Sequence, residues 1–262
     1  MEYACQNCNR NIIENFCGNC GQKQYKRIDR KYIGDELQYT LIHTNKGFLY
    51  SVKNILKNPG KTALEFIDGN RVNHYKPIGL AFVLSGISAF ISFKLLHFDQ
   101  TMKAVYAANK LSSPLMNDFM SISSSYSALI MLMSVPILAI LSKIAFNKWG
   151  QNYYEHVVMN AFGLSFYTMI SIFIYPFIYA AGKDLSLVSN ITTYSMLLIP
   201  LMMIWFYKSF YKDKPLKFII LRILLKMMMF GVIYVGVIIA IVLVLFVIKG
   251  APESMKYLQP VK

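Results

Sequence analysis

The chain has 262 residues, of which 55% are hydrophobic and only 15% charged, and its formal net charge is +14. Soluble domains carry about 25% charged residues, so this composition excludes an ordinary soluble protein and indicates one embedded in a membrane. Excess lysine and arginine in a membrane protein mark the cytoplasmic side and face anionic lipid. The positive charge therefore favours a lipid bilayer over nucleic acid as the partner.

All four cysteines lie near the amino terminus, in two Cys-x-x-Cys pairs formed by Cys5 with Cys8 and Cys17 with Cys20. Each pair places two thiolates on one tight turn, and two facing turns form the tetrahedral sulfur set that zinc prefers. Two disulfides are the alternative, but a reducing cytoplasm disfavours them. The spacing predicts a structural zinc site with all four cysteines as ligands, in a small zinc ribbon over residues 1–24. Zinc could serve solely to fold this segment, or the ribbon could also dock a partner.

Residues 25–76 carry short amphipathic patterns. Apolar residues recur at helical spacing in two groups, which are Ile33, Leu37 and Leu41, and then Phe48, Val52, Ile55 and Leu56. Asn58 before Pro59 resembles a capping residue followed by proline at the first helical position, and Gly69 can end that short helix. These helices are expected either to lie in the headgroup plane or to form a small cap on the loops of a membrane bundle.

Several short motifs accompany these patterns. They are Phe16-Cys17-x-x-Cys20-Gly21-Gln22-Lys23, Lys46-Gly47-Phe48, Asn58-Pro59-Gly60, Asp68-Gly69-Asn70-Arg71, Tyr75-Lys76-Pro77 and, further along, Tyr154-Glu155-His156. Together they resemble an uncharacterised bacterial membrane-protein family that carries a domain of unknown function. The resemblance implies an amino-terminal zinc ribbon before a multi-span membrane region. It implies no activity, because the family has none assigned.

Five apolar runs are each about 20 residues or longer, which is enough to cross hydrocarbon as helices. The runs are Pro77–Phe98, Tyr126–Phe146, Val157–Ala181, Leu187–Tyr211 and Phe218–Ile248. The last run could be one tilted helix, or an interfacial helix followed by a span. The predicted fold is an all-α membrane protein. Its parts are a zinc ribbon (1–24), cytoplasmic or interfacial amphipathic helices (25–76), a five-helix transmembrane bundle (77–248) and a carboxy-terminal tail (249–262).

The distribution of positive charge predicts the orientation of this bundle. With the amino terminus inside, the inner segments hold 20 Lys and Arg residues and the outer segments hold 6. The sequence also opens without a basic stretch before a short apolar run, so no cleavable signal peptide is expected. We therefore expect a multi-pass protein of the bacterial inner membrane, with a cytoplasmic amino terminus and a periplasmic carboxyl terminus.

Small residues recur every fourth position on two of the predicted spans. They are Ala81, Ser85 and Ala89 on the first span, and Gly236 and Ala240 on the last. This interval lets helix backbones approach closely in lipid. Each stripe could contact another span of the same chain, which we favour, or a second copy in a homo-oligomer.

Other residues within the spans bear on transport. Pro136, Pro176 and Pro200 can kink three spans and could frame a cavity, although proline is common in membrane helices. No Asp or Glu occurs in the five runs, which disfavours ion-coupled transport. The polar residues of the third span lie near one helical face and favour interhelix hydrogen bonds over a substrate path. They are Asn160, Tyr167, Ser171 and Tyr175.

Glu155 and His156 are the acid–base neighbours that open the third span. Adjacent helical side chains point about 100° apart, so the two cannot easily share one proton or one metal ion. We expect Glu155 to favour the helix amino terminus and His156 to bond a loop such as the one around Arg71. The common hydrolase, zinc-protease and nucleotide-binding motifs are absent from the sequence. The sequence thus predicts no catalytic residues and no enzyme.

Three functions are compatible with these features. The first, which the sequence favours, is a non-enzymatic scaffold or adaptor whose cytoplasmic zinc ribbon engages a cytoplasmic or membrane protein. The second is a passive channel or lipid-handling protein with a cavity framed by the proline-containing spans. The third is a membrane-tethered nucleic-acid sensor, which has weak support because its basic cluster contains few aromatic residues for base stacking. That cluster is Lys23, Lys26, Arg27, Arg30 and Lys31. A cavity reaching the middle of the bilayer would favour the second function.

Overall fold

The computed structural model describes residues 3–4, 8, 10–12, 15–20, 47–70, 74–182, 184–249, 252 and 257–259. The chain forms two compact units, residues 1–45 and residues 46–262. Some predicted features lie outside the described residues. Among them are the first amphipathic group, at Ile33, Leu37 and Leu41, and the basic cluster from Lys23 to Lys31.

The amino-terminal unit contains two short strands, β1 (Tyr3–Ala4) and β2 (Asn11–Ile12). They pair antiparallel, with Tyr3 opposite Ile12 and Ala4 opposite Asn11. An isolated two-stranded hairpin is marginally stable in water at best, so a unit this small needs another source of stability, such as a bound metal.

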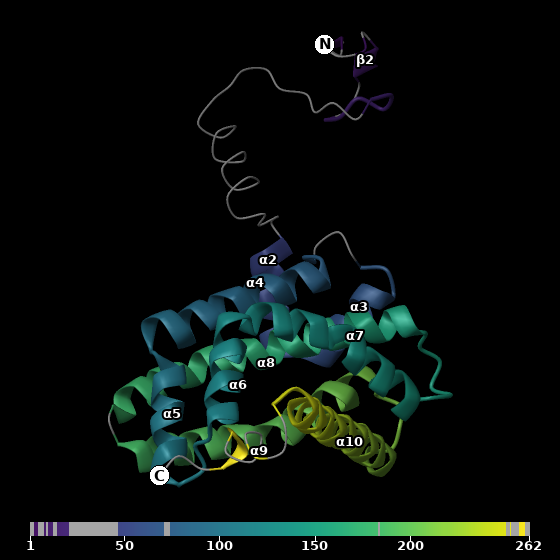
Figure 1. The fold of residues 1–262 in the computed structure, drawn as a ribbon. Coiled ribbons are helices and arrows are strands. Elements are labelled where there is room, and N and C mark those ends of the chain that lie inside the picture. The colour runs from purple at the N-terminus through teal and green to yellow at the C-terminus, as the bar shows by residue number, and fades with distance from the viewer. Residues whose placement is uncertain are drawn as a thin grey trace. The chain divides into compact units, whose positions relative to one another are not determined.

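Five described helices are long and apolar enough to cross a membrane, which confirms the predicted number of spans. They are α4 (Pro77–Ala89) continued by the π-helix η2 (Phe90–Leu95), α7 (Ser127–Ala145), α8 (Tyr153–Ala181), α9 (Leu185–Phe210) and α10 (Leu216–Lys249). Helix α8 lies between α4 and α9 and contacts both (Figure 1). Helix α10 is continuous over 34 residues, a length of about 51 Å. The last apolar run is therefore one long helix.

Two shorter helices precede the first span, α2 (Gly47–Lys57) and α3 (Pro59–Ile67). Asn58 caps α3 as predicted, and its side-chain oxygen accepts a hydrogen bond from the Lys61 N–H at 3.0 Å. The chain leaves α3 through Gly69, whose φ of +115° suits glycine. Both helices contact α8, and α3 also contacts α9. They form a helical cap on the bundle, which was one of the two predicted arrangements.

The cap is joined to the first span by a buried junction around His74. The Ser51 hydroxyl lies 3.3 Å from Nδ1 of His74 and accepts a hydrogen bond from the Tyr75 N–H at 2.8 Å. Burial lowers the pKa of His74, and the nearby Glu65 carboxylate opposes that shift. Burial between the cap and the bundle therefore favours the neutral imidazole over the charged form.

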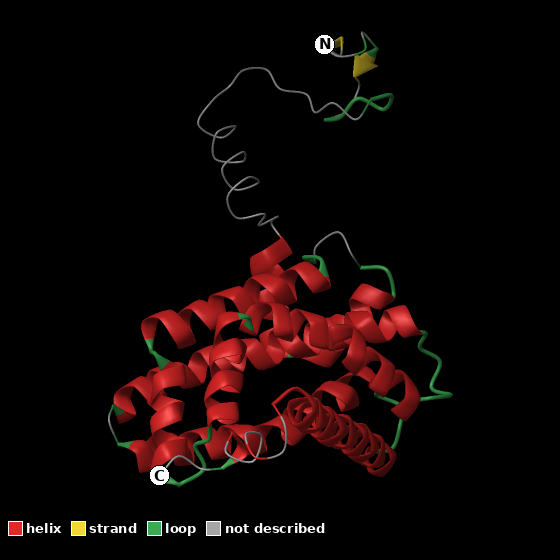
Figure 2. Cartoon of the chain, in the orientation of Figure 1, coloured by secondary structure: helices red, strands yellow, loops and turns green. Residues whose placement is uncertain are grey.

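Helices α5 (Phe98–Ala108) and α6 (Pro114–Ser125) connect the first two spans, where the sequence analysis predicted no helix. The signal was present, because Ser113 precedes Pro114 as Asn58 precedes Pro59. The Ser113 hydroxyl accepts a hydrogen bond from the Met116 N–H at 3.2 Å. Every described element between residues 47 and 249 is helical (Figure 2).

The two small-residue stripes behave differently. Ala81 and Ser85 are fully buried, and α4 packs on α7 and α8, so the first stripe mediates a contact within the chain. Gly236 and Ala240 are exposed, and a side chain at Gly236 would meet nothing within 4 Å. The expectation of an intramolecular contact is wrong for this second stripe. The buried residues of α10 lie in its first half, so its second half diverges from the described spans.

Candidate functional site

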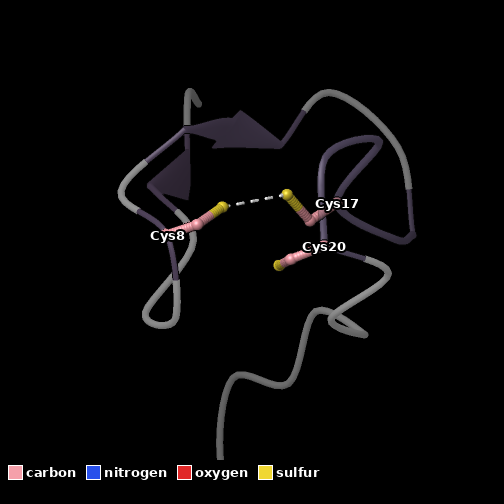
Figure 3. A group of neighbouring side chains, drawn as sticks. All are labelled: Cys8, Cys17 and Cys20. Atoms are coloured by element: carbon pink, nitrogen blue, oxygen red, sulfur yellow. Dashed lines mark hydrogen bonds between the residues drawn. The ribbon is translucent and has the colours of Figure 1, made fainter.

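Three of the four cysteines gather in the amino-terminal unit (Figure 3). The Sγ atoms of Cys8, Cys17 and Cys20 lie within 4.8 Å of one another, and those of Cys8 and Cys17 are 3.5 Å apart. Sulfurs around a tetrahedral zinc ion, with Zn–S bonds of about 2.3 Å, stand about 3.8 Å apart. The three thiols therefore fit such an ion, and no disulfide joins them to one another. Cys5, the fourth predicted ligand, lies outside the described residues.

The surroundings of Cys8 also favour the thiolate, the form that binds a metal ion. The pKa of the Cys8 thiol is lowered to about 6, chiefly by a hydrogen bond from the backbone of Arg10 and also by the Asn19 side chain. Metal ions bind the thiolate rather than the thiol. The local backbone thus favours the ligand form of Cys8.

The Glu155–His156 pair occupies the first turn of α8. Asn152 and Glu155 form a reciprocal capping box, with hydrogen bonds of 3.0 Å to the Glu155 N–H and 2.7 Å to the Asn152 N–H. This confirms the role predicted for Glu155 and explains why α8 begins four residues before the predicted start of the span. His156 is fully buried, and neither ring nitrogen bonds to a described residue. The predicted bond to a loop is absent there, and Arg71 lies outside the described residues.

A polar cluster links α7, α8, α9 and α10 inside the apolar bundle. The Lys226 ammonium donates hydrogen bonds to Asn160 Oδ1 at 2.8 Å and to the Tyr207 hydroxyl at 3.0 Å. Asn160 Nδ2 in turn donates to the Ser142 hydroxyl at 2.8 Å. Lys226 is only 6% exposed, and none of the described carboxylates forms an ion pair with it. A buried ammonium without a counter-ion is costly, so Lys226 is unusual for a structural residue.

Lys226 was not predicted as a site residue. Together with Lys217 and Arg222, it was counted only among the positive charges of an inner segment. The available signal was the depth of Lys226 within α10, beyond both Lys217 and Arg222. Ten residues separate it from the start of α10, which is about 15 Å of helix.

Beside this cluster lies a cavity of about 630 Å³ between α7, α8, α9 and α10. Met159, Met203 and Phe206 are among its apolar lining residues, and Lys226, Asn160 and Tyr207 form one polar end. Along α9 the lining runs from Met196 to Tyr207, about 16 Å of helix. Five lining residues are exposed, so the bundle does not fully enclose the cavity. They are Tyr167, Met196, Leu197, Met227 and Phe230.

A second cavity, of about 220 Å³, is lined by the end of α4, η2, the start of α5, and α7, α8 and α9. Its lining is rich in hydroxyl groups, including those of Ser88, Ser171 and Tyr175. The Ser88 and Tyr175 hydroxyls are 2.8 Å apart, which confirms an interhelix hydrogen bond on the polar face predicted for the third span. Tyr167 lines both cavities, so the two spaces adjoin.

These features define a mainly helical, multi-pass membrane protein with a cysteine cluster that could hold a metal ion. A family model described as "Protein of unknown function (DUF3667)" matches residues 45–89, which include α2, α3 and α4. The match agrees with the resemblance drawn from Asn58-Pro59-Gly60 and Tyr75-Lys76-Pro77. The cysteine cluster lies outside the matched residues. Neither a curated protein nor a solved structure matches the chain.

Proposed function

We propose that this protein is a non-enzymatic, lipid-handling protein of the bacterial inner membrane that binds a lipid-like molecule between α7, α8, α9 and α10. The cavity of about 630 Å³ carries this proposal. Pockets that bury small organic ligands have volumes of about 300–1,000 Å³ and mostly apolar linings. The exposed rim at Met196, Leu197 and Phe230 would let such a molecule enter sideways from the bilayer. This support places the lipid-handling alternative ahead of the scaffold.

Pro200 lies in the lining of this cavity, as expected for a proline-containing span that frames it. Pro136 and Pro176 also lie inside their helices but do not line the cavity.

In this proposal the bundle is oriented with α2 and α3 on the cytoplasmic side of the membrane, because positive charge is concentrated there.

The test is to count the lipids that copurify with the protein and to fill the cavity by mutation. Gly163 lines the cavity, and the nearest atom to a side chain added there is 3.9 Å away in Phe206. Gly163→Leu should therefore project into the space and expel a bound molecule. Gly86→Leu is the matched control, because nothing lies within 4 Å of a side chain at that position.

Native mass spectrometry of the full chain, released from mild detergent, would measure the result. We expect a bound lipid-like molecule in the wild type and in Gly86→Leu, and its loss in Gly163→Leu. A wild-type chain that carries no such molecule, or equal occupancy in all three proteins, would overturn the proposal.

We propose as a second function that the amino-terminal segment is a zinc ribbon that engages a partner protein in the cytoplasm. The clustering of Cys8, Cys17 and Cys20 supports it. A closed site with four sulfur ligands would be structural, since it leaves no open position for a substrate. Cys5 is the proposed fourth ligand, and zinc would then fold a unit too small for a core of its own.

Elemental analysis of the purified chain tests the metal. We expect one zinc ion per wild-type chain and its loss in Cys17→Ser and in Cys5→Ser. Affinity purification from gently solubilised membranes tests the adaptor role, because a partner should be lost from Cys17→Ser. Absence of zinc from the wild type would refute the ribbon, and unchanged partners in Cys17→Ser would refute the adaptor.

A further inference from the structure

We infer that the molecule bound in the large cavity carries an anionic head, a carboxylate or a phosphate, that binds the ammonium of Lys226. This inference rests on the proposed lipid-handling function and adds the chemical class of the ligand. Its basis is the positive charge of Lys226, which lies in the cavity wall, 6% exposed, among apolar helices.

None of the described carboxylates forms an ion pair with the Lys226 ammonium. No Asp or Glu occurs within the five apolar runs, and the ion pair found among the described residues joins Lys61 to Glu65, on α3. Glu155, at the start of α8, is engaged in its capping box. A buried charge is stabilised by a partner of opposite sign, and here that partner must come from outside these carboxylates.

The hydrogen-bonding capacity of the cluster also fits an anionic oxygen. An ammonium has three N–H donors, and Lys226 uses two of them, toward Asn160 and Tyr207. The Tyr207 hydroxyl accepts one of these bonds and keeps its own hydrogen to donate. One N–H of Lys226 and the O–H of Tyr207 can therefore both point at a ligand oxygen. Hydrogen bonds to an ionised acceptor are about twice as strong as neutral ones.

The position of the polar cluster of Lys226, Asn160 and Tyr207 favours an amphiphilic ligand over a free anion. Lys226 lies about 15 Å along α10 from its first residue, among apolar side chains. The part of the lining that α9 contributes, from Met196 to Phe206, is apolar. A ligand with a small anionic head and an apolar chain matches both ends of this space.

The test compares anionic ligands with neutral ligands of the same chain, using the full-length protein in nanodiscs of phosphatidylcholine. The first pair is palmitic acid and methyl palmitate, and the second is phosphatidic acid and diacylglycerol with the same acyl chains. The acid should bind the wild type at least about tenfold more tightly than its neutral counterpart, as expected for a charged hydrogen bond. The pair with the larger ratio identifies carboxylate or phosphate as the head.

Lys226→Met removes the charge and should reduce this ratio to about one. Lys217→Met, on an exposed residue of the same helix, should leave it unchanged. Equal binding of acid and neutral ligand to the wild type would overturn this inference while leaving the proposed function intact, as would a ratio preserved in Lys226→Met. Failure of every ligand to bind would overturn the proposed function as well. If Lys226→Met does not fold, the wild-type comparison decides.

Discussion

Gly60 lies where α3 packs against α9. Replacing it with alanine should destabilise the protein there, although alanine favours a helix more than glycine does. In an ordinary helix, alanine is more favourable than glycine by about 1 kcal/mol. A Cβ atom at Gly60, however, would overlap the carbonyl oxygen of Phe206 and lie 2.8 Å from both the Phe210 nitrogen and Ser209 Cβ. Two of these three atoms belong to the backbone, so no rotamer change can relieve the overlap. We expect Gly60→Ala to force α3 away from α9.

Overpacking of this kind costs about 1–3 kcal/mol, and a backbone clash belongs at the upper end. For a chain of this size, 1 kcal/mol corresponds to about 2–4 °C in Tm. Gly60→Ala should therefore lower Tm by about 6–12 °C. Gly86→Ala, on the exposed face of α4, is the control and should leave Tm unchanged or raise it slightly, because nothing lies within 4 Å of the added methyl group.

Thermal unfolding can be followed by tryptophan fluorescence in one detergent at one scan rate. Trp205 adjoins Phe206, the residue whose carbonyl the new Cβ would meet, so its emission reports on this contact. If the two alanine variants melt within about 2 °C of each other, the close approach of α3 to α9 is incorrect.

Four further predictions concern polar groups. Asn58→Ala should destabilise the protein by about 1 kcal/mol through loss of the α3 cap, measured as a lower Tm than that of the wild type. Tyr207→Phe should cost about 1–3 kcal/mol because it removes an acceptor from a buried ammonium. Tyr211→Phe should be neutral or stabilising, because Tyr211 is buried and its hydroxyl has no hydrogen-bond partner among the described residues. Equal Tm losses in Tyr207→Phe and Tyr211→Phe would contradict this. Burial lowers the pKa of His74, so the folded state binds fewer protons than the unfolded state, and stability falls as pH drops through about 6.5. His74→Gln should reduce the loss of Tm between pH 7.5 and pH 5.5, and an unchanged loss would exclude His74 as its source.

Local signals in the sequence were sufficient for much of the fold. Asn58 before Pro59 predicted the start of α3, and the acidic residue Glu155 predicted stabilisation of the start of α8. Such signals depend on a few consecutive residues, because helix caps bond within one turn. The same kind of signal at Ser113 and Pro114 was overlooked, and α6 was missed for that reason.

The large cavity could not be predicted from local signals. Lys226 lies 66 residues from Asn160 and 19 from Tyr207, and neither partner follows from the sequence around it. The second half of α10 shows the same limit, because Gly236 and Ala240 have suitable spacing for close packing yet remain exposed. Spacing defines which face a residue occupies, but the presence of a neighbour depends on how the other helices are placed.

The sequence by itself determined how many helices are long and apolar enough to cross a membrane, and that Cys8, Cys17 and Cys20 can meet around a metal ion. These properties depend on apolar length and on short-range spacing, which are fixed by covalent order. The tertiary structure alone decided that α3 lies against the backbone of α9 at Gly60, and that one lysine faces a cavity without a carboxylate among the described residues. Both depend on helices distant in sequence, whose relative placement is set by side-chain packing across the whole bundle.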